Sequence, residues 1–166
     1  MIPSLVEEGW PEAVERVAGV LRAAGVEARI EEFKVPTPTA ADAAKAAGCE
    51  PAQIVKSLVF LCGEQAVLAM VPGDRRAEPG RVAAAVGRPL AELAGADDVL
   101  RVTGFEPGGV SPFPLPGIER VLIDRSLLVQ ELVWIGAGSR RHLAALAPTD
   151  LARVSEAQAA DLSSGG

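Results

Sequence analysis

Hydrophobic positions along the chain follow helical spacing in some segments and strand-like runs in others, which predicts a domain of mixed α and β structure. Residues 53–61 form an almost wholly apolar run, which indicates a largely buried strand. Gly63-Glu64-Gln65 separates this run from a second apolar segment, so the pattern favours a β-hairpin. Within residues 7–24, a 4-3-4 spacing typical of one helix face joins Trp10, Val14, Val17 and Leu21.

The same patterns assign the rest of the chain. The predicted helices cover residues 7–24, 40–47, 79–86, 89–94, 140–146 and 149–151. The predicted strands cover residues 26–35, 53–61, 66–71, 97–102, 120–123 and 128–135. The glycines and prolines of residues 104–117 predict a loop with a defined backbone path. Adjacent hairpins argue against a purely parallel sheet, so we expect a single mixed α/β domain.

Length and composition agree with one domain. The chain has 166 residues, 49% of them hydrophobic, which suffices for a real core. We expect the domain to span residues 1–155, with an N-terminal helix inside residues 1–24, and a frayed polar tail over residues 156–166. The net charge of −6 argues against a broad electrostatic clamp on DNA or RNA, although a small basic pocket could still read one phosphate.

Cysteine use and the termini suggest a cytoplasmic protein. Cys49 and Cys62 match no zinc spacing and no Cys-x-x-Cys motif, so we expect free thiols. The first residues have no signal-peptide pattern, and no apolar stretch approaches the length of a membrane span. His142 is the only histidine, and no Ser/His/Asp set is evident by spacing, so no metal site or triad is predicted.

Lys56 is the most unusual residue of the chain, because it lies inside the apolar run of residues 53–61. A lysine in such a strand either snorkels to water, pairs with a carboxylate, or faces a cavity. The first two alternatives are structural. In a cavity, its ammonium group would hold a phosphate, a carboxylate or a carbonyl oxygen.

Two glycine-rich segments lie further along the chain. Gly108-Gly109-Val110-Ser111-Pro112 is either a structural turn or a loop whose amides point at a ligand. Gly136-Ala137-Gly138-Ser139 precedes a predicted helix, so it is either an anion site at a helix N-terminus or a tight packing turn in which Ser139 caps the helix. Asp124 is either part of a turn or an acid near a pocket, holding Lys56 or a substrate ammonium group.

In combination, these segments resemble the YbaK and prolyl-tRNA-synthetase-associated domain family of trans-acting aminoacyl-tRNA deacylases. The resemblance covers roughly residues 25–155 and keeps the family's order of motifs. The matching pieces are Thr39 with its helix, Gln53 to Phe60, Val71-Pro72-Gly73-Asp74, Thr103-Gly104-Phe105, Gly108 to Phe113, Ile123-Asp124 and Gly136-Ala137-Gly138. The lysine-bearing strand followed by a Gly-Gly-Val-x-Pro-Phe loop is the specific part of this match.

The resemblance implies a curved, mixed, largely antiparallel sheet flanked by helices, and hydrolysis of mischarged tRNA(Pro) carrying Ala or Cys. It places the family's essential lysine on Lys56, its Gly-x-x-x-Pro loop on Gly108 to Pro112 and its late glycine motif on Gly136 to Gly138. Catalytic roles are therefore expected for Lys56, Gly108 and Gly136. Substrate-binding roles are expected for Thr39, Ser57, Gly109, Pro112, Asp124, Ala137, Gly138 and Ser139.

The chemistry of these residues suits that activity without a cofactor or a metal. An aminoacyl ester needs little activation, so water can attack it once both are positioned. Backbone amides of the glycine loops would stabilise the developing oxyanion, and Lys56 would hold the terminal phosphate or orient the ester. Some relatives carry a histidine in the late glycine motif, whereas here Ser139 follows the motif and His142 lies further on.

The residues by themselves leave two other interpretations of the function open. One is a non-catalytic module of the same fold that binds a tRNA 3′ end, a nucleotide or a synthetase. The other is a small-molecule binder in which Lys56 holds a carboxylate. The acidic charge suggests that a prolyl-tRNA synthetase or an elongation factor delivers the aminoacyl-tRNA. Pocket size would set the amino acid removed.

Overall fold

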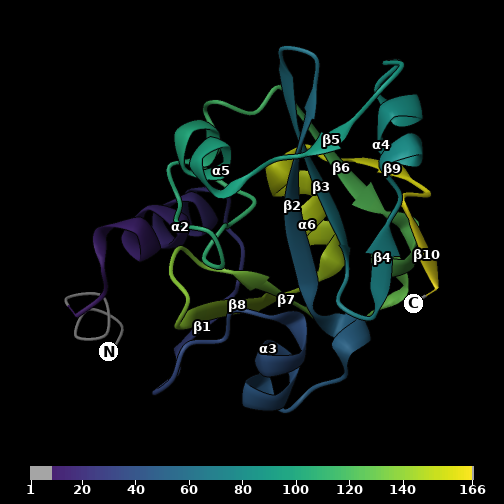
Figure 1. Cartoon of the computed structure of the whole chain (residues 1–166). Coiled ribbons are helices and arrows are strands. Elements are labelled where there is room, and N and C mark those ends of the chain that lie inside the picture. Colours follow the sequence, from purple (N-terminus) through teal and green to yellow (C-terminus); the bar gives the residue numbers. More distant parts are fainter. Residues whose placement is uncertain (1–8, 166) are drawn as a thin grey trace.

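The fold is a mixed α/β domain, as predicted, and it is built around a five-stranded sheet. The computed structural model describes residues 9–165 (Figure 1). The sheet has the order β5-β2-β3-β6-β9. Its strands are β2 (Val55–Cys62), β3 (Gln65–Pro72), β5 (Glu92–Leu93), β6 (Arg120–Asp124) and β9 (Gln158–Ala160). β2 pairs antiparallel with β3 and β5, whereas β3–β6 and β6–β9 are parallel.

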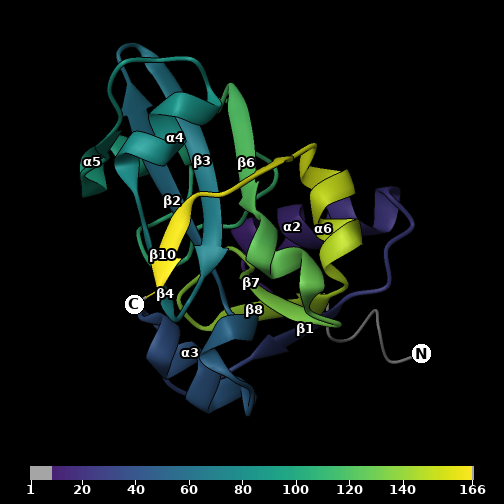
Figure 2. The ribbon, with the colours of Figure 1, turned by 90° about the vertical axis from the view of Figure 1, so that its right-hand side faces the viewer.

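Two smaller sheets flank the central one (Figures 1 and 2). The first has the order β1-β8-β7, and its strands are β1 (Arg29–Glu32), β7 (Val133–Gly136) and β8 (His142–Leu146). The second pairs β4 (Arg75–Ala77) with β10 (Ser163–Gly165). A parallel bridge between Ile54 and Trp134 joins the start of β2 to β7. Residues two positions further along each strand, Lys56 and Gly136, therefore lie at the same level.

Helices cover both faces of the central sheet (Figure 2). The helices are α2 (Glu12–Ala23), α3 (Ala40–Ala47), α4 (Pro79–Ala85), α5 (Ala96–Thr103) and α6 (Pro148–Ser155), and the 3-10 turns are Pro51–Gln53 and Arg125–Val129. Because side chains alternate along a strand, β3 sends Leu68 and Met70 to one core and its neighbours to another. Within the described residues, no helix has the length and apolarity that crossing a membrane requires.

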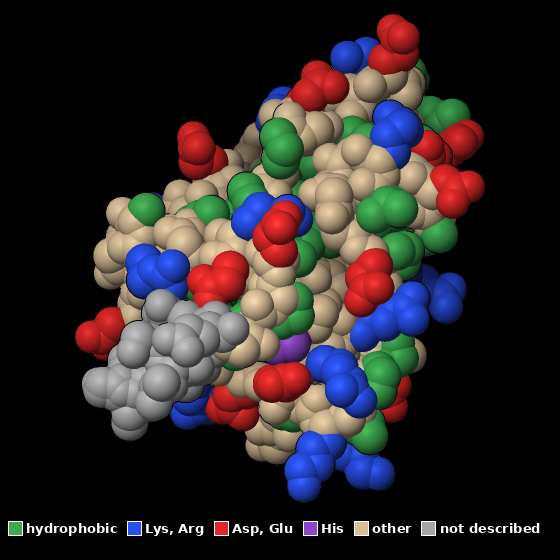
Figure 3. Space-filling model, turned by 90° about the vertical axis from the view of Figure 1, so that its left-hand side faces the viewer, with side chains coloured by type: hydrophobic (Ala, Val, Ile, Leu, Met, Phe, Trp, Pro, Cys, Tyr) green, Lys and Arg blue, Asp and Glu red, His purple; other side chains and the backbone are tan. Residues whose placement is uncertain are grey.

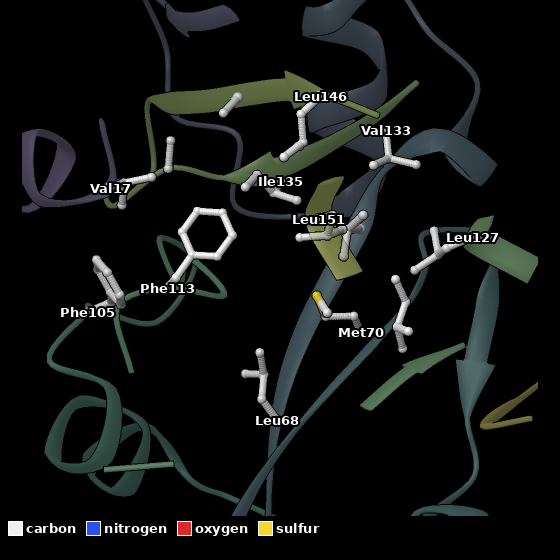
Figure 4. Close-up of a cluster of buried hydrophobic side chains, with 14 of the residues drawn as sticks. Val17, Leu68, Met70, Phe105, Phe113, Leu127, Val133, Ile135, Leu146 and Leu151 are labelled. Carbon is white, nitrogen blue, oxygen red and sulfur yellow. The ribbon is translucent and has the colours of Figure 1, made fainter. Parts of the chain in front are cut away.

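The larger core lies between the central sheet, α2 and α6 (Figure 4). Leu68 and Met70 of β3 meet Val17 of α2 and Leu151 of α6 there. Aromatic residues are scarce in the chain, yet two of its phenylalanines, Phe105 and Phe113, are placed in this core by the loop after α5. The smaller core packs α4 against the opposite face of β2 and β3.

The strongest local signals produced the expected elements. The helix predicted over residues 40–47 is α3, with Thr39 as its N-cap and Gly48 in the left-handed conformation at its C-cap. The Thr39 side chain accepts a hydrogen bond from the Asp42 amide. The predicted hairpin is β2–β3, and the loop over residues 104–117 contains no regular element after α5 ends at Thr103.

Three assignments are wrong, and a fourth is right only in its second half. Residues 140–146, predicted as a helix, contain strand β8, because their apolar side chains bury against β1 and β7 rather than along one helix face. Residues 97–102, predicted as a strand, lie in α5. Only the two-residue strand β5 replaces the helix predicted over residues 89–94. The strand predicted over residues 128–135 is a 3-10 turn followed by β7.

The polar tail is also not frayed over the part that the structure describes. Residues 158–160 form β9 beside β6, and residues 163–165 form β10 beside β4. Leu162 between them is fully buried in the smaller core. A single leucine in a polar segment is a weak signal in the sequence, and only packing against α4 in the smaller core buries it. The predicted start of the first helix at residue 7 lies outside the described residues.

Candidate functional site

A cavity of about 350 Å³ opens beside the start of β2. Its wall is mostly apolar, with Lys56 as its one charged side chain among the lining residues. The lining residues are Thr37, Pro38, Thr39, Ala40, Ala43, Ile54, Val55, Lys56, Ser57, Leu58, Gly108, Val110, Gly136 and Leu143. The three residues with predicted catalytic roles, Lys56, Gly108 and Gly136, thus meet at one cavity although up to 80 positions separate them in sequence.

Lys56 is half-buried and makes neither a salt bridge nor a side-chain contact with a carboxylate within the described residues. Its Nζ donates a hydrogen bond to the Arg75 carbonyl oxygen at 2.5 Å. Burial lowers the pKa of the Lys56 ammonium group, Asp74 opposes this effect, and Arg76 adds to it. A cation held by one carbonyl, with hydrogen-bonding capacity left over, is suited to an anionic or carbonyl-bearing ligand.

Lys56 also borders a second, wider groove on the side of β4 and β10. This groove measures about 1070 Å³ and is more polar than the cavity. Besides Lys56 and Leu58, which line both spaces, it is lined by Ala41, Pro51, Phe60, Gly73, Asp74, Arg75, Arg76, Ala77, Glu78, Pro79, Leu93, Ser164 and Gly165. The ammonium group therefore stands where the narrow cavity meets an open, charged groove.

The two glycine loops pack directly on each other. A Cβ atom placed on Gly136 would lie 2.3 Å from the Val110 carbonyl oxygen, and one on Gly109 would lie 2.8 Å from the Ser139 Cα. Since such contacts are too short for any side chain, glycine is required at both positions for backbone-to-backbone packing. Arg140 adds a further link, because its Nε donates to the Pro107 carbonyl at 2.9 Å.

The backbone amides of these loops differ in whether they donate a hydrogen bond within the protein. Gly109 donates to the Glu106 carbonyl, and Ala137 donates to the His142 carbonyl. The Gly108 amide, at the cavity wall, donates to no protein acceptor among the described residues. Gly108 also has a φ of +89°, which favours glycine at this position. It is therefore the candidate donor to an oxyanion.

Two hydroxyl-bearing residues of the predicted site line the cavity. Thr39 does so while its Oγ1 caps α3 and donates to the Asp42 carboxylate at 2.7 Å. Ser57 Oγ is buried and has no hydrogen-bond partner among the described residues. A buried hydroxyl without a partner costs free energy, so such groups often await a ligand or a water molecule. Neighbouring Thr37, which sequence reasoning missed, donates from Oγ1 to the Arg140 carbonyl at 3.1 Å.

The other predicted residues do not line this cavity. Gly109, Ala137, Gly138 and Ser139 support it from behind through the packing of the two loops, and Gly138 also lies against the backbone of α2. Pro112 lines a different surface pocket, next to α6. The apolar walls supplied by Ile54, Val110 and Leu143 were missed, because core residues and pocket residues have the same composition in sequence.

Asp124 has a structural environment. Its carboxylate accepts hydrogen bonds from the Ser126 amide, the Ser126 hydroxyl and, at 2.7 Å, the Leu162 amide. Burial raises the pKa of this carboxyl group, but the hydrogen bonds from Ser126 and Leu162 outweigh burial and lower it. Asp124 makes no contact with Lys56 and instead binds the segment that leads into β10.

The second glycine loop is not at a helix N-terminus, so both interpretations of this segment are wrong in placing a helix after it. It connects β7 to β8, so Ser139 caps no helix. Ser139 Oγ lies 2.5 Å from His142 Nδ1 and accepts from the Arg141 amide. Burial lowers the pKa of His142, with Glu32 opposing this effect. The ring of His142 therefore braces the loop from behind the cavity wall.

Comparison with known proteins agrees with this geometry. The model of the aminoacyl-tRNA editing domain family matches residues 34–154. An uncharacterised protein of Bacillus subtilis, YwhH, is 32% identical over 127 residues, covering 76% of this chain and 80% of that protein. The proline–tRNA ligase of Desulforamulus reducens is 31% identical over 129 residues, which cover 74% of this chain but only 22% of the ligase.

Solved structures show the same fold. The crystal structure of a candidate trans-editing enzyme for prolyl-tRNA synthetase superimposes with a TM-score of 0.86 at 36% identity, covering 95% of this chain and all of that one. A hypothetical protein, APE2540, superimposes with a TM-score of 0.84 at 32% identity, covering 90% and 99%. The matched segment contains the whole cavity wall, from Thr37 to Leu143. This chain belongs to the family of aminoacyl-tRNA editing domains.

Proposed function

We propose that this chain is a trans-acting deacylase that hydrolyses mischarged tRNA(Pro) carrying a small non-cognate amino acid such as alanine or cysteine. The observation that carries the proposal is the meeting of Lys56, Gly108 and Gly136 at one cavity in a member of the editing family. YwhH offers a precedent for such a domain as most of a separate chain, since the match covers 80% of it.

The reaction needs little beyond positioning. A water oxygen attacks the ester carbonyl carbon, and the bond from that carbon to the ribose oxygen breaks. One water proton passes to the departing ribose oxygen and the other is released to solvent, so tRNA leaves with a free hydroxyl group and the amino acid with a carboxylate. Negative charge develops on the carbonyl oxygen, and the unengaged Gly108 amide at the cavity wall is suited to stabilise it.

Lys56 is suited to hold the substrate rather than to attack it. An ammonium group is no nucleophile, and a lysine kept at a carbonyl with spare donors can bind the terminal phosphate or the ester oxygen. Its place between the cavity and the open groove would let the aminoacyl group enter the cavity while the polynucleotide stays outside.

The cavity wall supports a small amino acid. Ala43, Ile54 and Leu143 form an apolar surface, and a volume of about 350 Å³ lies at the low end for ligand pockets. Discrimination by such a wall is modest, about 1–3 kcal/mol per methylene group, so related small side chains should compete. A positively charged amino-acid side chain on the substrate would find no carboxylate among the lining residues of the cavity.

Delivery by a partner fits the molecular surface. Figure 3 shows acidic and basic side chains interspersed over one face, without a broad basic area. The net charge of −6 works against independent tRNA binding. We propose that a prolyl-tRNA synthetase or an elongation factor presents the acceptor end, and that the domain works without a metal or cofactor.

A deacylation panel tests the proposal. The purified chain is incubated with tRNA(Pro) charged with Ala, Cys, Ser, Thr or Pro, and release of the amino acid is measured. We expect release of Ala or Cys and retention of Pro. Lys56→Met, which keeps the side-chain length but removes the charge, should lower the rate by about 100-fold or more. Lys45→Met, on the exposed face of α3, serves as the control.

The outcomes separate the alternatives. A folded Lys56→Met variant with the rate of the original chain would refute the role of Lys56. If no charged tRNA is hydrolysed, a gel-shift titration with tRNA at several salt concentrations asks whether the chain binds it without catalysis. Binding that requires Lys56 would then favour the non-catalytic module of the same fold.

A further inference from the structure

We infer that β10 and the Arg75 side chain form a latch that positions Lys56, so that the chain segment after α6 is part of the site. This inference rests on the proposed role of Lys56 in deacylation. It starts from the acceptor of the Lys56 hydrogen bond, which is the main-chain carbonyl of Arg75 in β4. The position of Nζ therefore depends on where β4 lies.

β4 is a short strand. It contains three residues, and within residues 9–165 it pairs with β10 alone. The pairing places Arg75 opposite Gly165 and Ala77 opposite Ser163. A two-stranded ladder of this length is marginal by itself, so additional contacts must hold the two strands together.

The Arg75 side chain provides such contacts. Its Nε donates to Ser163 Oγ at 2.8 Å, and its terminal NH2 nitrogen donates to the Ser163 carbonyl at 3.0 Å. Ser163 is buried, so these charge-assisted bonds are shielded from water. The same residue that presents its carbonyl to Lys56 thus ties β4 to β10 through its side chain.

β10 is in turn anchored to the body of the protein. The preceding Leu162 is fully buried, its amide donates to the Asp124 carboxylate, and its carbonyl accepts from the Glu78 amide at 2.8 Å. Arg81 of α4 also donates to the Ser163 carbonyl at 3.0 Å. A continuous set of contacts therefore runs from Asp124 through Leu162 and Ser163 to Arg75 and Lys56.

Two substitutions, Arg75→Ala and Ser163→Ala, test the latch, and a third serves as the control. Arg75→Ala removes both bonds to Ser163 but leaves the carbonyl that Lys56 contacts. Because Arg75→Ala also removes a charge that faces Lys56, Ser163→Ala is needed beside it. Arg101→Ala is the matched control, because it removes an arginine of α5 that bonds Asp98 and lines neither the cavity nor the groove. Ser163→Ala removes one acceptor without any change of charge. Circular dichroism establishes that each variant folds.

The first measurement does not depend on activity. The chain has three lysines, so labelling lysine with 13C at Cε gives a small set of NMR signals, and Lys56→Met assigns the relevant one. Its titration midpoint should lie below 10.5 in the original chain. The groups that face the Lys56 ammonium are Arg75, Asp74, Arg76 and Glu78. We expect the midpoint to rise in Arg75→Ala and in Ser163→Ala, and to stay unchanged in Arg101→Ala.

The second measurement is deacylation of the substrate identified by the panel. Because the latch acts on the substrate through Lys56, Arg75→Ala and Ser163→Ala should each lower kcat/KM, Arg75→Ala by about tenfold or more, and neither should lower it further in the Lys56→Met variant. Arg101→Ala should leave kcat/KM unchanged. The latch is refuted by folded Arg75→Ala and Ser163→Ala variants with unchanged Lys56 titration, or by equal effects of Arg75→Ala and Arg101→Ala. If the original chain hydrolyses nothing, the proposed function fails, and the titration alone decides about the latch.

Discussion

Substitution of Gly136 by alanine is the sharpest test of how the two glycine loops build the cavity. Gly136 does not have a left-handed φ, so alanine causes no backbone strain of that kind. The added Cβ would lie 2.3 Å from the Val110 carbonyl oxygen, whereas real Cβ contacts stay above 3.0 Å. The loops must therefore separate by at least 0.7 Å, the difference between these two distances.

Both the stability and the activity should respond, but to different degrees. Overpacking of this kind costs about 1–3 kcal/mol, which lowers the urea concentration at the unfolding midpoint without preventing folding. A displacement approaching 1 Å at a site that works by positioning can lower the rate by about 100-fold. We thus expect a folded Gly136→Ala variant whose kcat falls much more than its stability.

The control is Gly19→Ala, which adds the same methyl group in α2 where nothing lies within 4 Å. That variant should gain about 0.5–1 kcal/mol from helix propensity and keep its activity. The assays are urea unfolding followed by circular dichroism, and deacylation kinetics at saturating substrate. A folded Gly136→Ala variant with unchanged kcat would show that the loop contact does not shape the site.

Four further predictions concern single residues. Thr39→Ala should lower the free energy of unfolding by about 1 kcal/mol through loss of the α3 cap, measured by urea unfolding against Thr149→Ala. Leu162→Ala should cost about 2–5 kcal/mol by opening a cavity beside α4, and an unchanged unfolding midpoint would contradict the burial of Leu162. Because the pKa of Asp124 is lowered below 3.8, its contribution to stability is present above that pH and disappears as the pH falls through the folded value, so Asp124→Asn should destabilise the chain at neutral pH and converge with it in acid. If the charged form of Lys56 is required, kcat/KM should fall as the pH rises through a pKa below 10.5, and a flat alkaline limb would oppose that role.

Local patterns predicted much of the fold but failed where tertiary contacts compete with them. The Thr39 cap, the Gly48 stop and the Gly63 turn each act within a few residues, so the sequence indicates α3 and the β2–β3 hairpin directly. Residues 140–146 were misassigned because a short apolar segment suits either a helix or a strand. Only pairing with β1 and β7 decides between them.

The sequence alone determined the identity of the unusual groups, a lysine in an apolar strand and two glycine segments, because charge and backbone freedom are properties of single residues. It left open whether Lys56 was structural and what Asp124 did. Tertiary structure decided that Lys56 meets Gly108 and Gly136 at one cavity, and that Asp124 instead holds the segment leading into β10. These outcomes depend on distances between residues far apart in the chain, which no local pattern contains. The bridge between Ile54 and Trp134 and the pairing of β4 with β10 set those distances.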